Sequence, residues 1–298
     1  MGGFYNVNGK KLQRQYCDIL SDFNEWKEKA HARKWLVFPE NIGPYLSIDE
    51  KKGSIVGIFS GTKVEPIINQ LLKIPGSKRA KVKEIFLDMA NSMKTIAQKC
   101  FPKAMQVTDR FHVQKLALEA LQDIRINHRW DAIDLENEQI KQARLKGKSF
   151  KPQEFDNGDT RKLLLARSRY LLYKAPNNWT ENQHARAKIL FDEYPDIKTA
   201  FNLVQGLRTI FNTSTSIEVA YTKLAHWYND VEKTGFKAFG TIVNTITINY
   251  RSILNYFINR SINASAESFN AKIKAFRAQF RGVKNVEFFL FRLTTIFA

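Results

Sequence analysis

Apolar and polar positions alternate along residues 44–114 in short blocks that predict strands and helices in turn. The predicted strands are residues 45–49, 54–60, 83–88 and 104–108, and the predicted helices between them are residues 65–73 and 91–100. Gly and Pro residues separate several of these blocks. Strands that alternate with helices are typical of an α/β fold with parallel strands.

Helical spacing of apolar residues dominates on both sides of this block. Residues 7–38 predict a basic helix, followed by a linker with two prolines. From about residue 115 to 260 strand patterns disappear, which predicts an all-α insertion. A basic amphipathic helix is expected from Ser265 to Arg277. We therefore expect four segments: a basic helical segment 1–43, the first part of the core 44–114, the helical insertion 115–261 and the closing helix 262–298.

Acidic residues stand where functional groups collect in such a sheet. Asp49 and Asp88 each close an apolar strand, and ligands bind at the carboxyl ends of the strands in open α/β sheets. Glu267, on the closing helix, supplies a third carboxylate if that helix packs against the sheet. Three carboxylates with open coordination positions suit Mg²⁺ (or Mn²⁺), and two such ions can clamp the oxygens of a phosphoryl transfer.

Each of these acids also has an ordinary structural explanation. Asp88 could cap the next helix, Asp49 could be an exposed turn residue, and Glu267 could be a first-turn acid favoured by the helix dipole. Asp109 and His112 are too few ligands for zinc, so a helix cap and a packed histidine explain them better. A supporting role for this pair near the acids stays open.

The closing helix has two faces of different character. One is an apolar stripe at helical spacing: Phe269, Ile273, Phe276 and Phe280. The other combines the acid with an amide and cations: Glu267, Asn270, Lys274, Arg277 and Arg281. This second face is either a solvated charged surface or a catalytic one, on which the acid binds metal and the cations follow phosphates.

The net charge of the chain indicates which class of molecule it binds. Lys and Arg number 47 against 29 Asp and Glu, a net charge of +18, which favours nucleic acid over a merely basic or membrane-attracted surface. The two cysteines, Cys17 and Cys100, exclude a cysteine-rich zinc module and fit a reducing compartment. No apolar stretch reaches membrane-spanning length. We expect a soluble cytoplasmic protein with no membrane partner.

Several motifs together resemble the ISL-three family of bacterial insertion-sequence transposases. They are Leu46-Ser47-Ile48-Asp49-Glu50, Phe86-Leu87-Asp88-Met89-Ala90-Asn91-Ser92-Met93, Cys100-Phe101-Pro102-Lys103-Ala104, Val107-Thr108-Asp109-Arg110-Phe111-His112-Val113-Gln114-Lys115, and the run from Asn263 to Lys274 with Arg281-Gly282. The resemblance implies a ribonuclease-H-like mixed sheet with a large all-α insertion before the last catalytic helix. It also implies Mg²⁺-dependent DNA strand cleavage, followed by attack of the freed 3′-hydroxyl on target DNA.

The resemblance assigns roles to residues of this chain. Asp49 and Glu267 match the first and third acids of a D-D-E triad. Asp88 and Asp109 both match motifs for the second, and Asp88 is preferred because the ribonuclease-H-like topology places that acid after the fourth strand. The supporting residues are then Asp109, His112 and Asn270. The cations expected to contact phosphates are Arg110, Lys272, Lys274, Arg277 and Arg281.

Two departures from the family pattern suggest alternatives. Only two strands fit before the helix near Glu65, where ribonuclease-H-like cores have three, as if a hairpin had been deleted. Residues 1–43 show no cysteine-rich or helix-turn-helix reader, so recognition of the element's ends would fall to a separate polypeptide or be missing. The alternatives are a catalytically impaired remnant that only binds DNA, or a ribonuclease-H-like nuclease or resolvase. The expected partner is double-stranded DNA, both element ends and target, bound by a homo-oligomer at the bacterial nucleoid.

Overall fold

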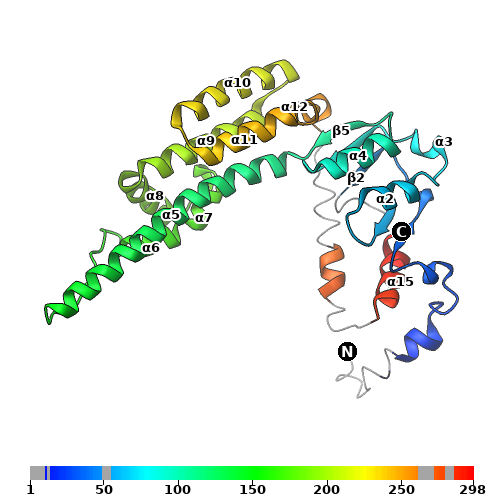
Figure 1. Ribbon diagram of the computed structural model, residues 1–298, viewed down its shortest axis with the longest axis horizontal. Coiled ribbons are helices and arrows are strands. Elements are labelled where there is room, and N and C mark those ends of the chain that lie inside the picture. The colour runs from blue at the N-terminus through cyan, green and yellow to red at the C-terminus, as the bar shows by residue number, and fades with distance from the viewer. Residues whose placement is uncertain (1–10, 12–13, 49–54, 261–271, 279–284) are drawn as a thin grey trace. The chain divides into compact units, whose positions relative to one another are not determined.

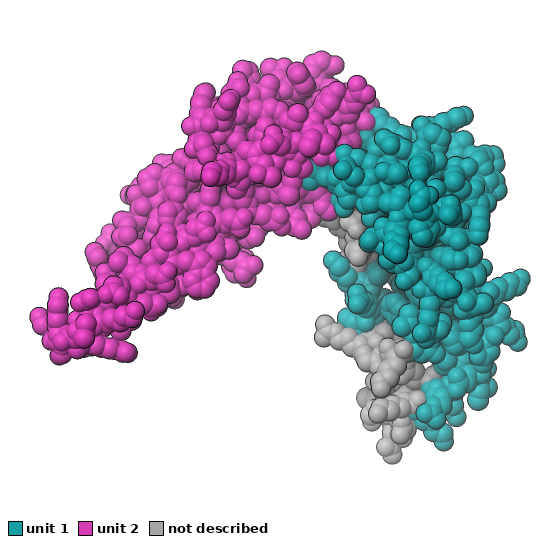
Figure 2. Space-filling model, in the orientation of Figure 1, with its two compact units in different colours: residues 1–109, 260–298 teal, residues 110–259 magenta. Residues whose placement is uncertain are grey.

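Residues 1–109 and 260–298 form one unit of the computed structural model, here the α/β unit, and residues 110–259 form a second, the helical unit (Figure 2). The structure describes residues 11, 14–48, 55–260, 272–278 and 285–298. The chain is mixed α/β, mostly helical with two small sheets.

The main sheet of the α/β unit has three parallel strands in the order β2-β4-β5. They are β2 (Tyr45–Ile48), β4 (Glu84–Leu87) and β5 (Met105–Thr108), and the helices between them are α2 (Val64–Leu71), α3 (Gly76–Arg79) and α4 (Asn91–Cys100). All four residues of β4 are buried, as expected for a central parallel strand covered on both faces. The predicted alternation of strands and helices over this region is confirmed.

Helices α2 and α4 cover one face of this sheet. Side chains alternate across a strand, so Ile85 and Leu87 of β4 point to the same face, where they pack with Ile68 of α2 and Ile96 of α4. All four are at most 3% exposed. This packing holds β4 in place and therefore fixes the position of Asp88, the residue that follows the strand.

The segment before β2 differs from the predicted basic helix. Apart from helical residues 11 and 14–15 and the π-helical turn η1 (Tyr16–Leu20), its described part holds turns, the 3-10 turn η2 (Lys27–Ala30) and strand β1 (Trp35–Val37), followed by η3 (Pro39–Asn41). Strand β1 pairs antiparallel with β3 (Gly57–Phe59). The helix prediction is thus wrong over most of its described length, and the described residues before α2 hold three strands, where two were predicted. The aromatic and aliphatic run of β1 suits a pleated, half-buried surface.

Helix α15 (Val286–Phe297) packs against aromatic residues of the first segment. Phe23 packs against two phenylalanines of α15, with ring centroids 5.3 Å from Phe288 and 5.6 Å from Phe291. Trp26 lies 5.6 Å from Phe291. These aromatic residues therefore pack against a distant helix, a contact that was not predicted from the sequence.

The helical unit is built on α5, the longest helix among the described residues; some of its helices pack along α5 and others pack on those helices (Figure 1). Its elements are α5 (Arg110–Leu145), α6 (Arg161–Arg167), α7 (Arg169–Tyr173), η4 (Pro176–Asn178), α8 (Glu181–Glu193), α9 (Pro195–Thr213), α10 (Ile217–Thr234), α11 (Lys237–Ile248), α12 (Tyr250–Leu254) and α13 (Tyr256–Asn259). None of the helices in the part of the chain that the structure describes is both long and apolar enough to cross a membrane.

Local signals set several of these helix boundaries. Thr180 and Gln183 form a reciprocal capping box at the start of α8, which satisfies two backbone N–H groups left free by the helix end. Gly235 ends α10 with φ +67°, a left-handed conformation that favours glycine. The long block of helical spacing in the sequence is confirmed as helix, and its first helix, α5, continues to Leu145.

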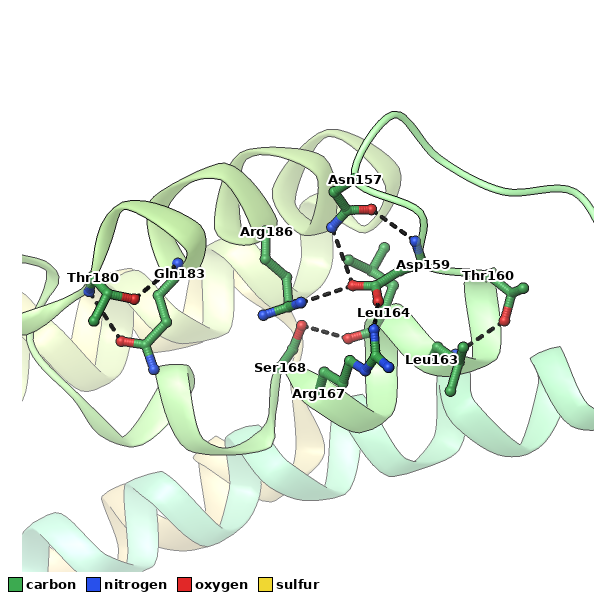
Figure 3. A network of polar contacts seen from close by, with 10 residues as sticks. All are labelled: Asn157, Asp159, Thr160, Leu163, Leu164, Arg167, Ser168, Thr180, Gln183 and Arg186. Atoms are coloured by element: carbon green, nitrogen blue, oxygen red, sulfur yellow. Dashed lines mark hydrogen bonds and ion pairs between the residues drawn. The ribbon is translucent and has the colours of Figure 1, made fainter.

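A buried carboxylate links α6 to α8 (Figure 3). Asp159 is fully buried; its Oδ1 pairs with Arg167, and its Oδ2 accepts from Arg186 Nε at 2.8 Å. Asn157 donates to the same Oδ2 at 3.1 Å. Burial alone would raise the pKa of Asp159, but the hydrogen bonds from Arg186 and Arg167 outweigh it and hold that pKa below its ordinary value.

The lowered pKa of Asp159 predicts acid sensitivity of the helical unit. Because the carboxyl binds its proton more weakly when folded, Asp159 stabilises the unit above the unfolded-state pKa, about 3.9, and that contribution is lost as the pH falls through the folded-state pKa. We expect the helical unit of Asp159→Asn to lose less stability on acidification than that of the unsubstituted chain. Urea unfolding at a series of pH values measures this, and equal pH dependence in both proteins would contradict it.

Candidate functional site

The carboxyl ends of the three parallel strands lie in register at one edge of the main sheet. Ile48 of β2 pairs with Leu87 of β4, and Leu87 pairs with Thr108 of β5. In the sequence, the residue after each of these three is an aspartate: Asp49, Asp88 and Asp109. Asp49 lies outside the described residues. The edge therefore presents Asp88 and Asp109 after neighbouring strands.

Asp88 stands in the turn between β4 and α4. It is partly exposed, and its Oδ1 accepts a hydrogen bond from the Ala90 backbone N–H at 2.8 Å. Helix α4 begins at Asn91, and the residue at its N-cap, Ala90, makes no side-chain cap. Asp88 thus orders the turn without capping the helix, and one bond to Oδ1 leaves its carboxylate able to bind a further partner.

Asp109 belongs to the α/β unit, and the residues that follow it belong to the helical unit. Asp109 is 7% exposed, and its backbone N–H donates to the Leu87 carbonyl at 3.1 Å. It directly precedes α5, where the helix N-terminus favours a negative charge. His112, in the first turn of α5, is half-buried, with its ring 5.7 Å from that of Phe111. The geometry is that of a buried helix-start acid, and a supporting role of this pair stays a prediction.

Arg110 makes contacts within the helical unit. Its Nη1 donates to Asn212 Oδ1 at 3.3 Å, and its guanidinium lies 5.9 Å from the centre of the Tyr256 ring. These contacts give Arg110 a structural role at the start of α5. Its predicted contact with phosphate stays a prediction.

Residues 272–278 of the closing segment are helical. Ile273 and Phe276 pack against β3 and α15, as the predicted apolar stripe requires, with the Phe276 ring 5.6 Å from Phe289 and 6.0 Å from Phe297. Three cations on this helix are exposed: Lys272, Lys274 and Arg277. The other predicted residues of this segment lie outside the described residues: Glu267, Phe269, Asn270, Phe280 and Arg281.

The support for this helix was not predicted from the sequence. Helix α15 supplies both rings that contact Phe276, and Asn285 caps it by accepting from the Phe288 backbone N–H at 3.0 Å. An asparagine followed by an apolar run of helical length was the available signal. Because α15 packs against residues 272–278, it determines where the cationic face of that helix lies.

Phe276→Leu is expected to loosen this packing. The substitution keeps an apolar side chain but removes two ring contacts, each worth about 0.5–1.5 kcal/mol beyond area burial. We predict that the α/β unit loses roughly 1–2 kcal/mol of unfolding free energy in urea titrations. Ala275→Ser, an exposed change on the same helix, should have almost no effect. Equal stability of both variants would show that the helix does not depend on this cluster.

The predicted metal ligands lie only partly within the described residues. Across the described ranges, no three His, Cys, Asp or Glu side chains gather closely enough to hold a metal ion. Two of the three predicted ligands, Asp49 and Glu267, fall outside those ranges. The donor chemistry fits Mg²⁺ or Mn²⁺, because the three predicted ligands are carboxylates and these ions prefer oxygen.

Comparison with known proteins identifies the family. A family model described as "Transposase", for DDE transposases of the ISL3 (ISL-three) type, matches residues 39–293. The chain belongs to this family. DDE transposases cleave and join DNA and in general use divalent metal ions, so membership agrees with the resemblance carried by the motifs.

Two curated relatives of the chain are transposases of the insertion sequence element IS1557 from Mycobacterium tuberculosis, strains CDC 1551 / Oshkosh and ATCC 25618 / H37Rv. Each is 27% identical over 203 residues, a match that covers 67% of this chain and 44% of the relative. The chain therefore spans less than half the length of these relatives in the match. No solved structure matches the chain significantly.

Proposed function

We propose that this chain is the catalytic part of a DNA transposase, which cleaves and joins DNA strands of an insertion sequence in a ribonuclease-H-like α/β unit. Asp49, Asp88 and Glu267 are the catalytic acids in this proposal. The observation that carries it is the register of the main sheet, in which Ile48 and Leu87 are paired and each is followed in the sequence by an aspartate.

Asp88 is the second acid for a geometric reason. It follows the central strand β4, which is paired with β2 on one side and β5 on the other, and its carboxylate is partly exposed. Asp109 follows the outer strand β5 and is buried. Carboxylates adjacent in such an edge repel one another unless a cation lies between them, so a pair after β2 and β4 is suited to hold a divalent ion.

The three acids would hold Mg²⁺ or Mn²⁺ through carboxylate oxygens. Such ions, when bound, polarise the scissile phosphate and lower the pKa of the attacking water or 3′-hydroxyl. The protein's own part is to fix the carboxylates: the bond from Ala90 N–H to Asp88 Oδ1 restrains one of them. Asp109, His112 and Asn270 are proposed to support the acids.

Cations of the closing helix would hold the DNA backbone beside the acids. Lys272, Lys274 and Arg277 are exposed on a helix whose other face is anchored by Phe276. Lysine and arginine bind phosphate without reading sequence. Arg110 and Arg281 are proposed as further phosphate contacts. The partner is double-stranded DNA, both element ends and target, bound by a homo-oligomer, with a separate polypeptide to recognise the ends.

The test is metal-dependent nicking of DNA. Inverted repeats in the DNA that flanks the coding sequence would define the element ends, and a labelled duplex carrying them is the substrate. We expect strand nicks at the element boundary with Mg²⁺ or Mn²⁺, and none when the ion is removed by chelation. DNA binding without cleavage under any divalent ion would contradict the proposal and favour a remnant that only binds DNA.

A further inference from the structure

Three arginines meet in the helical unit where α5 passes α6 and α7. Arg125 of α5 is 5% exposed; its Nε donates to Gln122 Oε1 at 2.7 Å, and its Nη1 donates to the Leu165 carbonyl at 2.8 Å. Gln122 also donates to the Arg169 carbonyl at 3.3 Å. Burial lowers the pKa of Arg125, and the nearby charges of Arg169 and Arg129 lower it further. The cluster Arg125, Arg129 and Arg169 is therefore one concentration of positive charge.

The described residues supply no carboxylate partner to this cluster. Arg129 Nε is buried and has no hydrogen-bond partner there. Arg169 is exposed, and its guanidinium lies 5.5 Å from the centre of the Tyr170 ring. Elsewhere in the same unit, buried Asp159 neutralises two arginines. Among the described residues, the helical unit thus has a carboxylate beside Arg167 and Arg186. It has none paired with the cluster.

Three positive charges packed together without an acid repel one another, which costs free energy. Binding of an anion from solution would offset this cost. A guanidinium presents its N–H groups as a planar fork that matches the oxygens of a phosphate. Arg125 uses only some of its N–H groups in its two bonds, and those bonds fix the orientation of its plane. The side chain of Arg169 is exposed and can approach a phosphate without rearranging the fold.

We propose that Arg125, Arg129 and Arg169 form a second phosphate-binding site for the DNA backbone, on the helical unit. The inference rests on the proposed action of this chain on DNA. Arg125 is the fixed member, and Arg129 and Arg169 complete the grip on the phosphate. Such contacts position a duplex without reading its sequence, so the site binds element ends and other duplexes alike.

The test compares the salt dependence of duplex binding between the unsubstituted full chain and its variants. Binding is measured in Ca²⁺ so that it is followed apart from cleavage. The double variant Arg129→Gln/Arg169→Gln should lower the slope of log affinity against log salt by about two, because each lost phosphate contact removes about 0.9. Affinity at low salt should fall by at least about tenfold. Arg129 Nε makes no hydrogen bond within the described structure and the Arg169 side chain is exposed, so the thermal unfolding midpoint should stay near that of the unsubstituted chain.

A matched control is Lys188→Gln/Lys237→Gln, which removes the same charge from exposed positions in α8 and α11 of the same unit. It should leave the slope nearly unchanged, whereas Arg129→Lys/Arg169→Lys should keep most of the affinity. An equal fall in slope for the glutamine cluster variant and the lysine control would overturn the site in favour of diffuse charge. An unchanged slope in the cluster variant would also overturn it.

Chemical protection tests the site without substitution. Phenylglyoxal modifies accessible arginines, and bound duplex should protect Arg129 and Arg169 as read by mass spectrometry. Modification at equal rates with and without duplex would overturn the site while leaving the proposed nuclease function intact. Failure of the unsubstituted chain to bind duplex would overturn both, and loss of metal-dependent nicking with intact protection would overturn only the proposed function.

Discussion

Asp88→Asn is expected to abolish metal-dependent nicking while leaving duplex binding intact. Asparagine keeps the size of the side chain and an Oδ1 that can accept the Ala90 N–H, so the turn before α4 should persist. What disappears is the negative charge that would hold the divalent ion. The loss should reach at least about 10²-fold in rate, the scale of removing one preorganised electrostatic group from an active site.

The matched control for this experiment is Asp192→Asn. Asp192 is an exposed acid in α8, so its replacement makes the same change of charge away from the sheet edge. Its nicking rate should equal that of the unsubstituted chain. If Asp88→Asn nicked at an unchanged rate while Asp109→Asn did not, the second acid would be Asp109, and the assignment of the supporting role would reverse.

Asp159→Ala is expected to have the largest effect on stability. The substitution leaves Arg186, which is mostly buried, and Arg167 without their shared carboxylate. Removing one partner of a buried ion pair costs about 3–5 kcal/mol, and the value should lie toward the lower end because Arg167 is half exposed. Urea unfolding followed by circular dichroism should show the helical unit unfolding earlier.

The control for this substitution lies three residues away. Asp156→Ala removes an exposed acid from the same loop and should change the unfolding free energy by less than about 0.5 kcal/mol. Because the chain has two units, each transition should be fitted separately. A similar cost for both variants would show that the Asp159 network does not hold α6 and α8 together.

The sequence predicted the main sheet because its signals are local. Strands β4 and β5 are short runs rich in apolar and β-branched residues, and α4 between them ends just before Pro102, so residue type and chain breakers suffice to predict them. The sequence also placed Asp88 at a strand end. It could not supply the register that pairs Ile48 with Leu87, because strand pairing depends on residues far apart in the chain.

Long-range packing explains the failures. Phe23 and Trp26 pack against α15, a distant helix that local spacing does not reveal, and most of the described segment around them was wrongly predicted as helix. The buried network of Asp159 was invisible for the same reason: Arg186 approaches it from another helix. Tertiary contacts outweighed local propensity at each of these places.

Iron-directed cleavage of the polypeptide tests the catalytic assignment most directly. Fe²⁺ can replace Mg²⁺ at a carboxylate site, and with ascorbate and peroxide it generates hydroxyl radicals that cut the backbone beside the bound ion. We predict cuts near Asp49, Asp88 and Glu267, suppressed by excess Mg²⁺ and lost in Asp88→Asn. Cuts confined to other acids, or cuts near Asp88 that persist in Asp88→Asn, would contradict a metal site built from these three carboxylates.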